Sequence, residues 1–66
     1  MQKGSIKSYD KEGGSGMIDR LGDSEVKFFS TNVIGRDRMS LKTGDNVWYE
    51  IDNVKNVQIA INIRKA

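Results

Sequence analysis

The stretch Gly13-Gly14-Ser15-Gly16-Met17-Ile18 decides the class of fold that this chain can adopt. Each glycine destabilises a helix by about 1 kcal/mol, because glycine loses the most backbone freedom there. Three glycines in four positions therefore exclude a stable helix. Glycine in a strand is typical of a sharp bend in a small barrel, or of a close approach to the backbone by another body. A phosphate-binding loop would end in Gly-Lys-Ser/Thr and open a helix, and this stretch does neither.

Outward from this stretch, short strand-like runs alternate with polar turns. We expect strands at Gly4–Asp10, Gly14–Asp19, Glu25–Phe29, Asp45–Asp52 and Val57–Arg64. Residues that favour turns separate them at Lys11–Gly13, Leu21–Ser24 and Asn53–Asn56. Ser30–Val33 suits a helical turn with Val33 in the core, and Ile34–Thr43 is a longer polar loop. Five short strands without a long helix, proline or repeat predict an all-β fold: a small five-stranded antiparallel barrel, one domain over residues 1–66.

The third run divides into two faces, since successive side chains of a strand point to opposite sides. Val26 and Phe28 share one face, and Lys27 and Phe29 share the other. The face with valine is the better core candidate. We therefore expect Phe28 inside and Phe29 outside.

The last two runs also alternate. Val47, Tyr49 and Ile51 alternate with polar residues in a half-buried pattern, which leaves Trp48 on the outward parity. In the final run, one parity holds Val57, Ile59, Ile61 and Ile63, and the other holds Gln58, Ala60, Asn62 and Arg64.

Composition excludes several kinds of chemistry. The chain of 66 residues has no cysteine and no histidine, so zinc sites, thiol chemistry and histidine acid–base catalysis are excluded. The carboxylates follow turn and surface positions without a nucleophile–base arrangement, so we expect no enzyme, no metal and no cofactor. The formal net charge of +2 is a mild basic bias. No apolar run approaches membrane-spanning length, and we expect a soluble, cytoplasmic protein.

Four segments give the chain a family resemblance. Lys3–Ile18 resembles the opening of a bacterial cold-shock protein, whose pattern is Lys-Gly, an apolar residue, Lys-Trp-Phe-Asn, then Lys-Gly-Phe-Gly-Phe-Ile. Glu25–Ser30 lies where that family carries Asp-Val-Phe-Val-His-Phe. Ser40–Val47 is similar to its Leu-x-x-Gly-x-x-Val, and Ala60–Ile63 to its Ala-Ala-Asn-Val. The resemblance implies the oligonucleotide-binding (OB) barrel of cold-shock type.

The resemblance also implies single-stranded RNA or DNA as partner, bound by aromatic side chains on the second and third strands. Much of that aromatic platform is replaced. Ser8 stands where the family has a tryptophan in its first strand, and Ser15 where it has a phenylalanine in its glycine-rich strand. Ser30 stands where the family has the second phenylalanine of its third strand. Three lost stacking positions remove about 3 kcal/mol, because base stacking contributes about 1–3 kcal/mol per base. Tight binding of the family type is therefore not expected.

Basic replacements compensate in part. Lys27 and Arg38 stand where the family has aromatic residues, and Lys7 matches a family lysine. These cations can hold phosphates, and a guanidinium can stack on a base. The expected contact residues are those that bind the backbone, meet bases or permit close approach: Lys7, Tyr9, Gly14, Gly16, Met17, Lys27, Phe29 and Arg38.

Several of these residues also have an ordinary structural interpretation. Lys27 is equally an ordinary solvated strand residue, Phe29 a small satellite core under the long loop, and Tyr9 a packing residue at the barrel rim. Trp48 has no counterpart in the family pattern. It is either covered by neighbouring Lys or Arg stems or exposed as a partner surface.

The sequence leads to weak, largely sequence-independent binding of single-stranded nucleic acid, in an RNA chaperone or a regulator of gene expression. The alternative is a divergent barrel that has lost nucleic-acid binding and acts as a protein-interaction module, or as a homodimer through a surface that includes Trp48. A third reading is a barrel that works within a translation complex.

Overall fold

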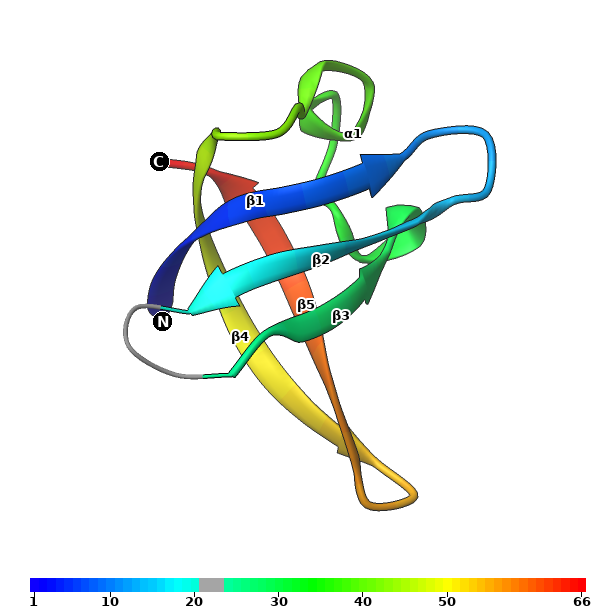
Figure 1. Cartoon of the computed structure of the whole chain (residues 1–66), viewed down its shortest axis with the longest axis vertical. Coiled ribbons are helices and arrows are strands. Elements are labelled where there is room, and N and C mark those ends of the chain that lie inside the picture. Colours follow the sequence, from blue (N-terminus) through cyan, green and yellow to red (C-terminus); the bar gives the residue numbers. More distant parts are fainter. Residues whose placement is uncertain (21–23) are drawn as a thin grey trace.

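The computed structural model describes residues 1–20 and 24–66, and over these residues five strands close into one barrel (Figure 1). The strands are β1 (Gln2–Asp10), β2 (Ser15–Arg20), β3 (Val26–Phe29), β4 (Asn46–Val54) and β5 (Val57–Lys65). A 3₁₀ turn, η1 (Ser30–Asn32), and a one-turn helix, α1 (Asp37–Ser40), join β3 to β4. The predicted all-β, five-stranded barrel is confirmed. Most of the predicted turn at Leu21–Ser24 lies outside the described residues.

The strands follow one another around the barrel in the order β1–β2–β3–β5–β4, and β4 pairs again with β1. Four of the pairings are antiparallel, but β3 and β5 run parallel, with Lys27 opposite Ile59. The prediction of an antiparallel barrel is therefore wrong at this one seam. The reason is geometric: directions cannot alternate all the way around a closed ring with an odd number of strands.

The core fills the interior of this barrel. Val26 and Phe28 of β3 are buried, whereas Lys27 and Phe29 are exposed, as the alternation predicts. The side chains that make up the core come from all five strands and the long loop: Ile6, Ile18, Val26, Phe28, Val33, Leu41, Val47, Tyr49, Ala60 and Ile63. In β4 the parity is also confirmed, with Val47 and Tyr49 inside and Trp48 outside.

β5 departs from its sequence pattern. Its apolar series does not form one inward face, because Ala60 and Ile63 are both fully buried. The pairing with β4 shifts by one residue between Glu50–Ile61 and Trp48–Arg64. Asn62 absorbs the extra residue as a bulge, with a left-handed backbone at φ 51°. Ile63 is thereby turned inward, and the apolar residues before the bulge are left on the outer surface.

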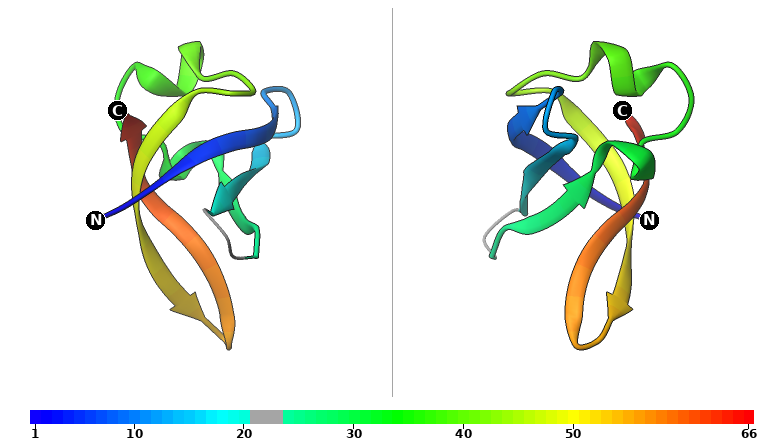
Figure 2. Two further views of the ribbon diagram at one scale, coloured as in Figure 1. Left: turned by 60° about the vertical axis from the view of Figure 1, so that its left-hand side comes forward. Right: turned by 90° about the vertical axis from the view of Figure 1, so that its right-hand side faces the viewer.

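The segment predicted as a polar loop is more structured than expected. It contains α1, and Leu41 directly after α1 is fully buried in the core. The Asp37 carboxylate accepts a hydrogen bond from the Lys65 backbone N–H at 2.9 Å. Lys11 Nζ donates to the Met39 carbonyl at 2.9 Å. These contacts tie α1 to the end of the barrel where β1 and β5 end (Figure 2).

The β4–β5 hairpin is longer than predicted and projects beyond the barrel at the opposite end from α1 (Figures 1 and 2). β4 runs to Val54, which pairs with Val57. The turn is therefore only Lys55-Asn56, and both residues have positive φ, at 51° and 67°. Such two-residue turns match the right-handed twist of the strands that they join.

Candidate nucleic-acid interface

The first three strands bring six polar, basic and apolar side chains onto one outer surface. Directly opposed residues of neighbouring strands point to the same side of a sheet. The register aligns Ser8 with Met17 and Met17 with Lys27 in one row. In the next row it aligns Asp10 with Ser15 and Ser15 with Phe29. We call this surface the β1–β3 face, defined by Ser8, Asp10, Ser15, Met17, Lys27 and Phe29.

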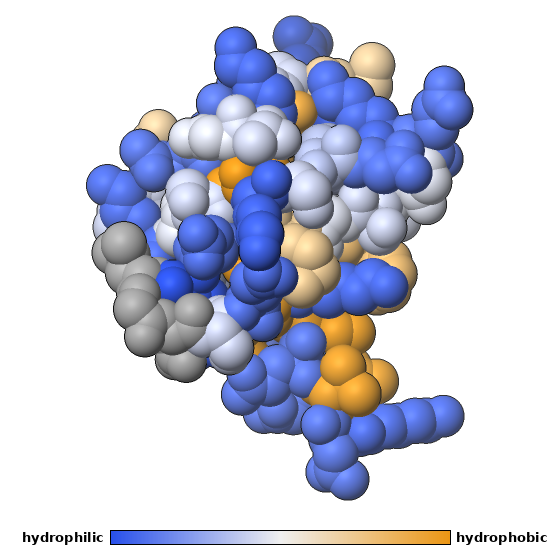
Figure 3. Space-filling view, viewed as in Figure 1, coloured by the Kyte–Doolittle hydropathy of each residue, from blue (hydrophilic) through white to orange (hydrophobic). Residues whose placement is uncertain are grey.

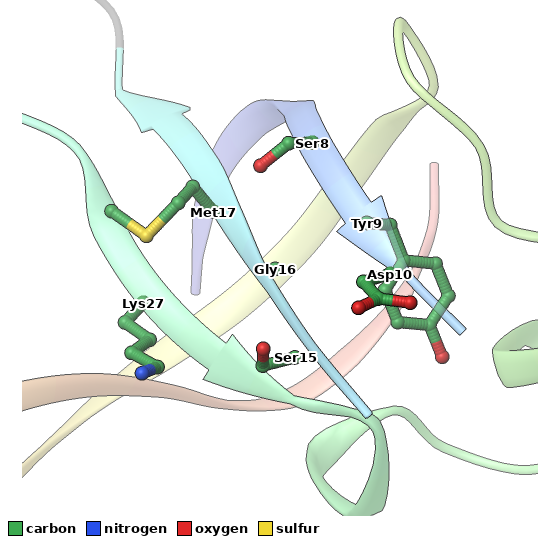
Figure 4. Close-up of a pocket in the computed structure, with 7 residues that line it drawn as sticks. All are labelled: Ser8, Tyr9, Asp10, Ser15, Gly16, Met17 and Lys27. Atoms are coloured by element: carbon green, nitrogen blue, oxygen red, sulfur yellow. The ribbon is translucent and has the colours of Figure 1, made fainter. Parts of the chain in front are cut away.

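A shallow cavity of about 370 Å³ lies on this face. It is lined by Ser8, Tyr9, Asp10, Ser15, Gly16, Met17 and Lys27 (Figure 4). In Figure 4 the Met17 and Lys27 side chains lie on the same side of the sheet, while the Tyr9 ring stands apart from them beyond Asp10. The cavity is open, as a surface that receives flat bases needs to be.

Lys27 and Phe29 form a pair at the β3 side of this face. The Lys27 Nζ lies 5.2 Å from the centroid of the Phe29 ring, and the ring is 39% exposed. Within residues 1–20 and 24–66, Lys27 makes no ion pair. A cation that rests on an exposed ring can move to a phosphate and leave the ring for a base.

Tyr9 lines the cavity but is not one of the outward side chains that define the β1–β3 face, because it pairs with the buried Gly16. Its ring packs against Phe28, with the centroids 5.3 Å apart and a tilt of 40°. Its hydroxyl donates to the Arg38 carbonyl at 3.1 Å. These contacts place Tyr9 at the barrel rim, which matches the packing interpretation rather than the base-stacking one.

The two glycines predicted to permit close approach of a ligand have structural roles in the barrel. Gly16 is buried, and a Cβ there would lie 2.4 Å from the Ser8 carbonyl oxygen and 2.7 Å from the Phe28 ring. Its missing side chain thus makes room for Phe28. Gly14 has a φ of 75° in the β1–β2 turn, a backbone conformation that other residues rarely adopt.

Lys7 lies at an irregularity in β1, between Ile6 and Ser8, where the pairing with β2 shifts by one residue. Its ammonium group donates a hydrogen bond to the Glu25 carboxylate and forms an ion pair with it. The hydrogen bond and the charge of Glu25 raise the pKa of Lys7 above its ordinary value. Lys7 therefore stays protonated, and Glu25 balances its charge within the chain, in contrast to Lys27.

Arg38 lies on α1 with an exposed side chain. Its carbonyl accepts the Tyr9 hydroxyl, so α1 stands beside the rim at the end of β1. Arg38 therefore borders the β1–β3 face at the Tyr9 side, while Lys27 lies at the β3 side. Lys27 therefore lies on the β1–β3 face itself, whereas Arg38 lies beyond it on α1.

Trp48 belongs to a different surface. It pairs with Lys3 of β1 and with Arg64 of β5, and the Lys3 Nζ lies 5.6 Å from the centroid of its ring. The ring is 38% exposed. Lys3 thus partly covers the ring, which agrees with the first of the two interpretations of Trp48, coverage by neighbouring Lys or Arg side chains.

Sequence reasoning missed two features of the candidate interface. Asp10 places a carboxylate on the β1–β3 face, although one of its oxygens is engaged by the backbone N–H groups of Glu12 and Gly13 at 3.1 and 3.0 Å. Ile59 of β5 lies next to Lys27 and extends the face with an apolar side chain. The irregularity at Lys7 changes which side of β1 the Asp10 side chain faces, so alternation along the chain does not predict it. The bulge at Asn62 has the same effect for the outward direction of Ile59.

The described residues offer no group of three or more carboxylates that could hold a metal ion. In the same part of the chain, no helix has the length and apolar character needed to cross a membrane. No family model matches the chain, and no curated protein matches it.

Proposed function

We propose that this barrel binds single-stranded nucleic acid weakly and with little sequence preference, through the β1–β3 face. The observation that carries the proposal is the Lys27–Phe29 pair: an ammonium group without an ion pair in the described part of the chain, over a half-exposed ring in the same sheet as Met17. Phe29 and Met17 would meet bases, and Lys27 would meet a phosphate. Arg38 would contact the backbone at the rim. The resemblance to cold-shock proteins supports this surface, and with it a cytoplasmic role as an RNA chaperone or regulator of expression.

The physical balance favours low affinity. One aromatic ring and one thioether replace a row of rings, so stacking contributes about 1–3 kcal/mol at each of only a few bases. Lys7 is neutralised by Glu25, and Asp10 repels phosphate from its end of the face. Most of the binding free energy must then come from counterion release at a small number of cations, which makes binding strongly dependent on salt.

The test is a titration of ¹⁵N-labelled protein with a single-stranded heptamer of mixed pyrimidines at low and moderate salt. We expect amide shifts in β2 and β3, and affinity that falls steeply as salt rises. Trp48 fluorescence should change little, because this ring lies on another surface. An absence of shifts at low salt, or shifts confined to the Trp48 surface, would refute the proposed interface.

Two lysine variants make the test specific. Lys27→Gln should weaken binding and lower the slope of log affinity against log salt by about 0.7, the contribution of one phosphate contact on a single strand. Lys55→Gln is the matched control, because Lys55 is an exposed lysine in the hairpin turn, away from the β1–β3 face. Equal effects of the two substitutions would show that only bulk charge matters.

A further inference from the structure

The outer surface of the β4–β5 hairpin carries an apolar column that the barrel core does not use. Ile59 and Ile61 are partly exposed, and Val57 at the hairpin end is 56% exposed. Val54, which pairs with Val57, is 45% exposed. Apolar side chains gather over this hairpin on the molecular surface (Figure 3). The column continues to Phe29, because β3 and β5 run parallel and alternation brings Phe29 level with Ile61.

Opposite charges border this column on its two sides. On the β3 side, Lys27 is directly opposite Ile59. On the β4 side, Asp52 pairs with Ile59 and Glu50 pairs with Ile61. At this position along the strands, a cation (Lys27), an apolar residue (Ile59) and an anion (Asp52) therefore lie side by side across β3, β5 and β4.

Such a row is complementary to itself. If two sheets pack face to face about a two-fold axis parallel to β5, each residue keeps its level along the strand, while the β3 side of one sheet meets the β4 side of the other. Ile59 then lies on Ile59 of the second copy, and Lys27 of each copy faces Asp52 of the other. A two-fold axis across the strands would instead bring β3 over β3 and place the two Lys27 side chains on the same side.

We propose that a second copy of this chain docks on the β5 face, which we define as Val54, Val57, Ile59 and Ile61. The two copies form a symmetric dimer with β5 on β5 and with reciprocal Lys27–Asp52 pairs. Closed two-fold interfaces of this kind use the same patch on both partners. The hairpin projects beyond the barrel, so that a second copy can approach it closely (Figure 1). Because the patch is small, the association is weak and needs high protein concentration.

The test is sedimentation equilibrium of the full chain without nucleic acid, from about 10 µM to about 1 mM, the range in which a small interface associates. We expect the average mass to rise from that of the 7.4 kDa chain toward twice that mass. A mass that stays at that of one chain over the whole range would overturn the proposal.

Substitutions locate the interface. Val57→Thr with Ile59→Thr removes apolar surface but keeps β-branched side chains, and should weaken dimerisation at least tenfold. Ile34→Thr is the matched control, because Ile34 is 46% exposed but lies outside the β5 face, and it should leave the dimer unchanged. If Trp48→Ser abolishes a dimer that Val57→Thr with Ile59→Thr leaves intact, the interface is at Trp48 and the proposal is wrong.

A charge reversal tests the orientation independently of the apolar substitutions. Lys27→Glu alone and Asp52→Lys alone should each weaken the dimer, because each places like charges opposite one another. The double variant restores the opposite charges and should recover most of the affinity. Failure of the double variant to recover, while both single variants weaken, would overturn the proposed orientation.

The dimer covers Lys27 and Phe29, so it competes with the oligonucleotide for the same side chains. Adding the pyrimidine heptamer should lower the average mass of the protein component at a fixed chain concentration. This last expectation rests on the proposed function, whereas the measurements without nucleic acid do not. If the average mass of the dimer does not change when the heptamer is added, the result counts against the nucleic-acid interface. If the chain binds the heptamer but never dimerises, the result counts against the β5 face.

Discussion

At the scale of single residues, Gly16 connects the glycine-rich stretch to the core. A methyl group at this position would meet the Ser8 backbone and the Phe28 ring at distances that atoms do not adopt. We predict that Gly16→Ala lowers the free energy of unfolding by about 1–3 kcal/mol, the usual effect of overpacking a tight core. Urea denaturation followed by circular dichroism measures the change.

Ser15→Ala on the same strand is the control for this substitution, since Ser15 points to the outer face. It should change the free energy of unfolding by less than about 0.5 kcal/mol. A Gly16→Ala variant as stable as Ser15→Ala would show that the strand can move away from Phe28.

Lys7 and Glu25 form an ion pair whose contribution depends on pH. Glu25 raises the pKa of Lys7 in the folded chain above the ordinary 10.5. A raised pKa stabilises the fold fully below the unfolded value, and this stabilisation is lost as the pH rises through the folded value. We predict that Lys7→Gln is less stable than the parent chain at pH 8, and that this difference shrinks above about pH 11. Urea denaturation at the two pH values, with Lys55→Gln as control, measures it; a difference that persists at the higher pH would contradict the prediction.

At the scale of elements, the bulge at Asn62 decides which side chains of β5 enter the core. Its φ of 51° is accessible to glycine and asparagine but strained for a β-branched residue. We predict that Asn62→Val lowers the free energy of unfolding by about 1–2 kcal/mol. Asn62→Gly should be tolerated, with a change below about 0.5 kcal/mol. Thermal denaturation of both variants provides the measurement, and a stable valine variant would mean that β5 can pair without the bulge.

At the scale of the whole molecule, the barrel has one weak seam. β4 and β5 pair from Val47–Lys65 to Val54–Val57, whereas β3 and β5 share, among residues 1–20 and 24–66, only the Lys27–Ile59 pair. Val33 adds an isolated bridge to Ile63, beyond the end of β3. Segments with few backbone hydrogen bonds open first in the native state. Opening at this seam would separate β3 from β5 while the long hairpin stays intact.

We predict that native-state hydrogen exchange shows lower opening free energies for β3 amides that face β5 than for amides between β4 and β5. Exchange measured by nuclear magnetic resonance at several low urea concentrations gives these values. Equal protection of both groups would mean that the barrel opens only by global unfolding.

The amount of structure predictable from sequence differs between elements for a physical reason. In β3 and in the first part of β4, the alternation runs without interruption, so the inward positions of Phe28 and Tyr49 and the outward position of Trp48 follow directly. In β1 and β5, a one-residue shift in pairing breaks the alternation. Parity counted along the chain is then wrong beyond the shift, so that Ala60 and Ile63 are both buried although they stand on opposite parities.

The candidate site shows the same division. Lys27 and Phe29 lie on one surface, as their parity predicts, and Met17 joins them because it pairs with Lys27. Tyr9 and Lys7 do not join them as free groups, because Tyr9 packs on Phe28 and Lys7 pairs with Glu25. Both partners are distant in sequence and adjacent only in the folded barrel.

The sequence by itself determined that this chain forms short strands without a long helix, and which residues of the uninterrupted strands face the core. These properties depend on local backbone preferences and on alternation between neighbours, which are present in any stretch of chain. Only the tertiary structure decided the parallel seam, the outward apolar column of β5 and the ion pair of Lys7 with Glu25. Each of these follows from which strands meet when the barrel closes, because an odd ring forces one parallel pair and a bulge reverses the faces of a strand.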